Sequence, residues 1–76
     1  MFTSYRRELI EDINYKAKRN EILKKQLAKE LNKVNRTALD YYSVCAVNTL
    51  DHIVNISLEI AENSQDIYEK SQFLIA

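Results

Sequence analysis

The chain of 76 residues contains neither glycine nor proline. Glycine gives a tight turn its left-handed backbone conformation at little cost, and proline presets the backbone of other turns. Walker-type and dinucleotide-binding loops are excluded, because they need glycine where the backbone approaches a phosphate. The sequence therefore predicts an almost entirely helical chain in which Asn and Ser make the bends.

Size and cysteine content limit how such a chain is stabilised. A chain this short buries a modest fraction of its surface, so it needs well-packed helices, a metal, disulfides or self-association. Cys45 is the only cysteine and His52 the only histidine, which argues against an internal disulfide and a Cys/His metal site. We expect one helical domain over residues 1–76 with no cofactor and no metal.

A first helix is predicted over residues of about 4–34, with Thr3 or Ser4 as its N-cap. Lys16 and Asn20 interrupt its apolar sector. A polar residue in a helical seam fixes register or partner number at some cost in stability. Local fraying, or Lys16 extending to water, is the alternative. The apolar residues that define the sector are Phe2, Tyr5, Leu9, Ile13, Ala17, Leu23, Leu27, Leu31 and Val34.

A second helix is predicted over about 38–62, after a break at "NRT". Thr37 and Asp40 have the spacing of a capping box. The segment "ENSQD" is expected to end or kink this helix before a short third helix over about 66–75, although the two can also form one bent helix. A heptad repeat typical of helix pairs runs through both segments: Leu39, Ala46, Ile53, Ile60, Ile67 and Leu74.

These patterns predict an all-α fold: a long helical hairpin with a short C-terminal helical extension. The second helix carries more apolar residues than one seam needs, so a homodimer forming a four-helix bundle is the simplest way to cover them. The expected dimer interface includes Val47, Ile53, Val54 and Leu58.

Charge divides the chain into two halves. Residues 1–36 hold ten basic and five acidic side chains, whereas residues 37–76 hold one basic and six acidic side chains. At 100° per residue, one row of basic side chains projects away from the leucines: Arg7, Lys18, Lys25, Lys29, Lys33 and Arg36. The acidic residues of the second helix also lie away from its apolar sector: Asp40, Asp51, Glu59 and Glu62. We therefore expect the two charged faces not to meet within one hairpin.

Three interpretations of the basic row compete: a solvated surface, a nucleic-acid contact, and a dock for an acidic protein. The pI of about 6.6, and the absence of aromatic residues between positions 16 and 36, disfavour nucleic acid. Tyr15 and Ile22 lie near the edge of the basic row, as apolar anchors of a protein-binding site do, although isolated exposed apolar residues are common. The candidate partner-binding residues are Tyr15, Lys18, Ile22, Lys25, Lys29 and Lys33.

Catalytic chemistry is not expected. His52 lies on the polar side of its helix without a serine or cysteine nucleophile at helical spacing, and Cys45 is interpreted as a reduced, partly buried thiol. The sequence shows no signal peptide and no membrane span, so we expect a cytoplasmic protein. The predicted function is that of a small non-enzymatic protein-binding regulator, adaptor or inhibitor, and a nucleic-acid-binding regulator is the alternative. Plentiful Asn, Lys, Ile and Tyr, with AT-rich codons, indicate a low-GC bacterium, phage or plasmid as the source.

Overall fold

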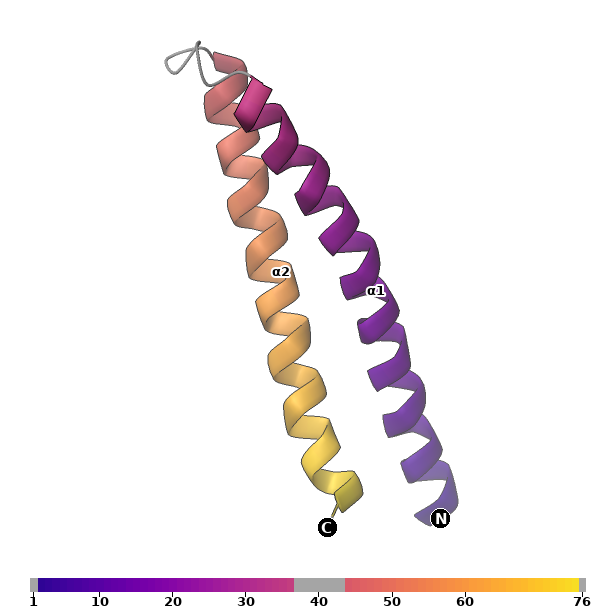
Figure 1. Cartoon of the computed structure of the whole chain (residues 1–76). Helices are drawn as coiled ribbons and strands as arrows, with labels where there is room; N and C mark the ends of the chain where they lie inside the picture. The colour runs from indigo at the N-terminus through magenta and orange to yellow at the C-terminus, as the bar shows by residue number, and fades with distance from the viewer. Residues whose placement is uncertain (1, 37–43, 76) are drawn as a thin grey trace.

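The computed structural model is an antiparallel hairpin of two long helices, α1 (Phe2–Arg36) and α2 (Val44–Ile75), with both termini at the same end (Figure 1). The structure describes residues 2–36 and 44–75, and the side chains of 4–34 and 47–75. Every residue in the two described ranges is helical and none forms a strand. The predicted all-α helical hairpin is confirmed. The expected cap at Thr37 and Asp40 lies outside the described residues.

α2 is one continuous helix, so the break expected at 63–66 is absent and residues 66–75 are its C-terminal part. Asn and Ser interrupt helices when their side chains compete for nearby backbone groups. Here the side chains of Asn63 and Ser64 bond instead to Asn20 on α1. Because their polar groups have partners across the hairpin, they leave the backbone of α2 undisturbed.

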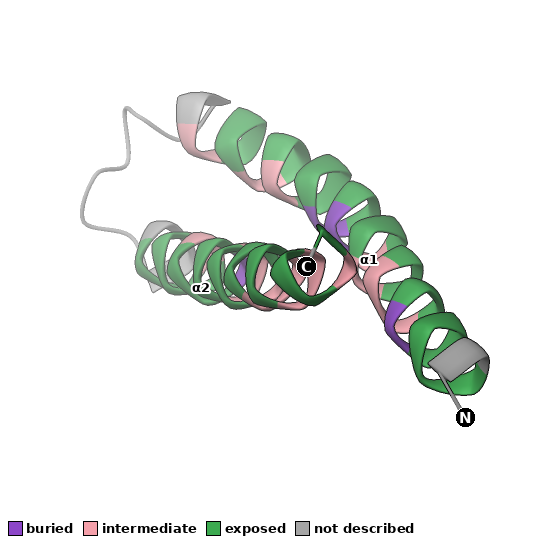
Figure 2. Ribbon diagram, turned by 90° about the horizontal axis from the view of Figure 1, so that it is seen from below, coloured by how far each residue is buried: buried purple, intermediate pink, exposed green. Residues whose placement is uncertain are grey.

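The two helices meet along a single seam, and the buried and half-buried residues lie on their facing sides (Figure 2). Seam residues alternate in spacings of three and four, as the heptad repeat predicts. Tyr5, Ala17 and Leu31 were expected in this sector but are exposed. The seam consists of Leu9, Ile13, Lys16, Asn20, Leu23, Leu27, Glu30 and Val34 on α1, and of Thr49, Ile53, Ile56, Ile60, Asn63, Ile67, Lys70 and Leu74 on α2.

An asparagine pair at the centre of the seam sets the register. Asn20 is only 6% exposed; its Oδ1 accepts a hydrogen bond of 2.9 Å from Asn63 Nδ2. Its own Nδ2 donates to Ser64 Oγ at 3.2 Å and to the Ile60 carbonyl at 3.5 Å. A shift of one helix along the other would separate these groups and leave a buried amide unpaired, which is costly. Asn20 therefore has the register-fixing role that its place in the apolar sector suggested.

A four-residue ionic cluster extends the polar part of the seam toward the termini. Lys16 pairs with Asp66, and Lys70 pairs with Asp12. Additional contacts join Lys16 to Asp12 at 3.6 Å and Lys70 to Asp66 at 2.9 Å. Two ammonium and two carboxylate groups balance each other, so Lys16 is held in the seam instead of extending to water.

The apolar core is thin for a chain of this length. Among the described side chains, the buried apolar residues are Leu9, Leu23 and Ile56, and Leu23 alone is as little as 2% exposed. The radius of gyration is 17.1 Å, whereas a compact domain of this length has one of about 11 Å. Two helices side by side therefore leave most of their circumference uncovered.

Asn20→Ala should lower the free energy of unfolding by about 1–3 kcal/mol, because it removes hydrogen bonds to Asn63 and Ser64 in the seam. Urea titration followed by circular dichroism, at one fixed protein concentration, measures this change. The matched control is Asn14→Ala, since Asn14 is an exposed asparagine on the same helix and its loss should change stability by less than about 0.5 kcal/mol. Equal effects of the two substitutions would contradict the role assigned to Asn20.

Candidate protein-binding surfaces

Ion pairs close one flank of the hairpin seam. Arg19 Nε donates to Glu59 Oε2 at 2.8 Å, and Arg19 Nη2 lies 3.4 Å from Glu59 Oε1. Farther along the same flank, His52 Nδ1 lies 3.9 Å from Glu30 Oε2. Glu59 of the predicted acidic face therefore does pair within the hairpin, although its partner Arg19 is not a member of the predicted basic row. We call this side of the seam the ionic flank.

The Arg19–Glu59 pair shifts the pKa values of both groups. The hydrogen bond from Arg19 lowers the pKa of Glu59 below its ordinary value of 4.5, although desolvation opposes the shift. The hydrogen bond to Glu59 likewise raises the pKa of Arg19. Because a charged hydrogen bond favours the ionised form of each partner, the two side chains hold each other in place at neutral pH.

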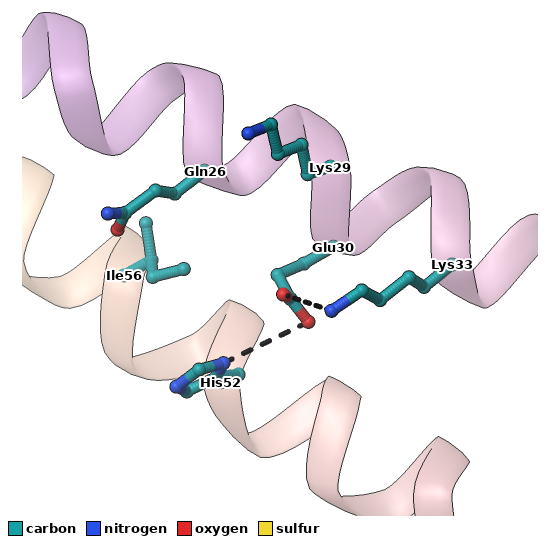
Figure 3. Close-up of a pocket in the computed structure, with 6 residues that line it drawn as sticks. All are labelled: Gln26, Lys29, Glu30, Lys33, His52 and Ile56. Atoms are coloured by element: carbon teal, nitrogen blue, oxygen red, sulfur yellow. Dashed lines mark hydrogen bonds and ion pairs between the residues drawn. The ribbon is translucent and has the colours of Figure 1, made fainter.

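A groove of about 460 Å³ lies beside the ionic flank, between the two helices (Figure 3). Its most buried charge, Glu30, accepts a hydrogen bond of 3.0 Å from Lys33 and also faces His52. His52 is exposed on the polar side of α2, as predicted. The other described lining residues are Gln26, Lys29 and Ile56, so no described residue of the lining is a serine, threonine or cysteine nucleophile. In the described part of the chain, no group of His, Cys, Asp or Glu is arranged to hold a metal ion.

The outer side of α1 carries most of the predicted partner-binding residues. Tyr15 and Ile22 are 68% and 51% exposed, so no part of α2 covers them. The exposed lysines Lys18, Lys25 and Lys29 lie on the same side of the helix, and within the described ranges they form no ion pair. We call these five residues the basic face. Lys33, the sixth predicted residue, lies at its edge and pairs with Glu30.

The four residues predicted at a dimer interface occupy two different places. Ile53 is half-buried in the hairpin seam, so it belongs to the packing of α2 against α1. Val47, Val54 and Leu58 are exposed. Cys45 lies within α2, but its side chain is outside the described part of the structure.

A second apolar row was found only in part from the sequence, because the predicted dimer interface includes just two of its residues, Val47 and Val54. It follows the side of α2 that lies across the seam from the ionic flank, and its residues are all exposed. Its signal was present, because five of its members recur every seven residues, each immediately after a residue of the predicted heptad repeat. The row consists of Val47, Leu50, Val54, Ala61, Tyr68 and Ile75.

α1 contributes to the same side of the hairpin. Ile10 and Leu31 are exposed on the side of α1 that faces away from Arg19, next to the α2 row. Lys24 lies between them and pairs with Glu21 at 3.3 Å. We call Ile10, Leu31 and the α2 row together the apolar flank. The hairpin therefore has an ionic flank, an apolar flank and, on the outside of α1, a basic face.

In comparisons with known proteins, the chain matches no protein-family model, no curated protein and no solved structure. Within its described residues, neither helix combines the length and the apolar character needed to cross a membrane.

Glu59→Gln should reduce the loss of stability on acidification. The lowered pKa of Glu59 means that its contribution is present above about pH 4.5 and is lost as the pH falls through the lower, folded-state pKa. Thermal melting at pH 7 and at pH 3 measures this effect. The fall in Tm between pH 7 and pH 3 should be slightly smaller for the variant than for the wild type. Glu62→Gln is the matched control, since Glu62 is exposed on α2 without an ion pair in the described ranges. If the fall in Tm on acidification were reduced equally in both variants, Glu59 would have no special part in the acid sensitivity.

Proposed function

We propose that the chain is a small non-enzymatic protein-binding regulator, adaptor or inhibitor, and that its basic face docks an acidic surface on another protein. The observation that carries this proposal is the exposure of Tyr15 and Ile22 beside three lysines that form no ion pair with any described residue. Aromatic and aliphatic anchors surrounded by charged residues are typical of binding hot spots. Complementary charge around such anchors chiefly sets the specificity and the rate of association.

The neighbourhood of the two anchors supports a protein partner. Tyr15 and Ile22 are seven residues apart, two turns along α1, so a partner helix or strand can contact both at once. The lysines beside them extend long side chains whose charges remain in water until a partner supplies carboxylates. Exposed ion pairs contribute only about 0–1 kcal/mol each, so the apolar anchors would provide most of the affinity.

Site-specific photo-crosslinking tests this proposal. With a benzoylphenylalanine in place of Ile22, the protein should crosslink to one discrete partner in an extract of its native cell. Excess wild-type protein should compete for that partner, and Ile22→Asp protein should compete at least tenfold less well. The matched control carries the same probe at Phe73, an exposed apolar residue of α2, and should not yield the same product.

Two results would count against the basic face. Competition by Ile22→Asp as effective as that by the wild type would remove Ile22 from the interface. An identical set of products from positions 22 and 73 would show non-specific contact with apolar side chains.

Nucleic-acid binding is the second candidate, because Lys18, Lys25 and Lys29 form an exposed lysine row without acidic partners in the described ranges. Such a row neutralises phosphates and releases counterions, so affinity would fall steeply with salt. A mobility-shift titration with duplex and single-stranded DNA and RNA, from 25 to 200 mM salt, measures this. Lys25→Glu with Lys29→Glu should abolish a genuine shift. No shift by the wild type at low salt would eliminate this candidate.

A further inference from the structure

We propose that the apolar flank is the surface on which a second copy of this chain docks, giving a four-helix bundle of two hairpins. This surface is separate from the basic face, and the inference does not depend on the proposed function. It differs from the predicted dimer interface, because it assigns Ile53 to the hairpin itself, leaves out Leu58 and brings in residues of α1.

The hairpin leaves enough area exposed for a second copy to cover part of it. The chain exposes 6322 Å², whereas a compact folded monomer of 8.9 kDa exposes about 4,800 Å². The excess of roughly 1,500 Å² is large enough for a stable interface, which takes about 800 Å² from each partner. An elongated hairpin without a partner therefore exposes more surface than its mass requires.

The composition of the flank fits helix packing. Together with Ser57, Ser64 and Ser71, the α2 row has residues spaced alternately three and four apart, as in the hairpin seam. None of these α2 positions carries a charged side chain. Val54, about a third of the way along α2, is 54% exposed. A row of this kind packs against another helix as the seam itself does. On the ionic flank, in contrast, Arg19 already pairs with Glu59, and Lys33 with Glu30, within the hairpin.

Charge selects the arrangement of the two copies. α1 holds ten basic and five acidic residues, and α2 holds one basic and five acidic residues. Stacking α1 of one copy on α2 of the other brings helices of opposite net charge together and spreads like charges apart. This requires a twofold axis parallel to the helices, so the C-terminal end of α1 lies at the same end of the bundle in both copies. Leu31 of one copy then lies level with Leu50 of the other.

The oligomeric state is tested first. Analytical ultracentrifugation of the wild type should give twice 8.9 kDa at micromolar concentrations, and Val54→Asp should shift the dimer dissociation constant upward by at least a hundredfold. Ile22→Asp is the matched control, because Ile22 is similarly exposed on the basic face, and it should leave the dimer intact. A mass of 8.9 kDa for the wild type throughout the dilution series, or a dimer unaffected by Val54→Asp, would overturn the proposal.

Disulfide trapping tests the same interface without requiring a folded monomer. Chains carrying Leu31→Cys and chains carrying Leu50→Cys, both in a Cys45→Ser background, are unfolded, mixed, refolded and oxidised. The stacking of α1 on α2 predicts a disulfide between the two kinds of chain. Mixing Ile10→Cys with Leu31→Cys should give none, because these residues lie at opposite ends of the bundle. An efficient disulfide between Ile10→Cys and Leu31→Cys chains would overturn the arrangement. The absence of a disulfide in both mixtures would also overturn it.

The two proposals fail separately. Loss of the dimer on Val54→Asp with partner capture by the basic face retained would support both surfaces. A dimer abolished by Ile22→Asp and retained by Val54→Asp would place the second copy on the basic face and overturn the assignment made here.

Discussion

The hydrogen bonds of Asn20 with Asn63 and Ser64 are the constraint on which the rest of the hairpin depends. Apolar seam residues tolerate sliding by one heptad, because leucine and isoleucine pack in either register. The buried amide of Asn20 does not tolerate such sliding, because sliding would remove its hydrogen-bond partners. The neighbouring cluster around Lys16 and Asp66 imposes the same register through charge. These polar contacts contribute less to stability than to uniqueness, the best attested role of buried polar groups in helix pairs.

Once the register is set, the two flanks of the seam acquire different characters. On one flank Arg19 meets Glu59, and both groups are satisfied within the chain. On the other flank apolar side chains of both helices lie exposed. The outer side of α1, with Ile22 between lysines, is a third surface, and it points away from α2. The proposed self-association and the proposed binding of a different protein therefore use separate surfaces, so each surface can be altered without changing the other.

The sequence predicts the architecture well and its surfaces less well, for physical reasons. The absence of glycine and proline and the heptad repeat through Ile60 were sufficient for the helical hairpin. Asn63 was misread as a helix breaker, because its partner on α1 is not visible in local sequence. Leu31 and Glu59 were misplaced because a period of 3.6 residues drifts by about 20° per heptad from the 3.5-residue period of paired helices. The exposed apolar row of α2 was predictable from its own seven-residue repeat, whereas the identity of a partner for the basic face is not encoded in one chain.

The most direct test is an isotope-filtered NOE experiment on a mixture of labelled and unlabelled chains, refolded together. The side-chain amide protons of Asn20 should show NOEs to Asn63 and Ser64 of the same chain, and methyl groups of Val54 should show NOEs between chains. Contacts of Asn20 with residues one heptad away, or with Asn63 of a different chain only, would contradict an intramolecular hairpin whose register is set by this polar pair.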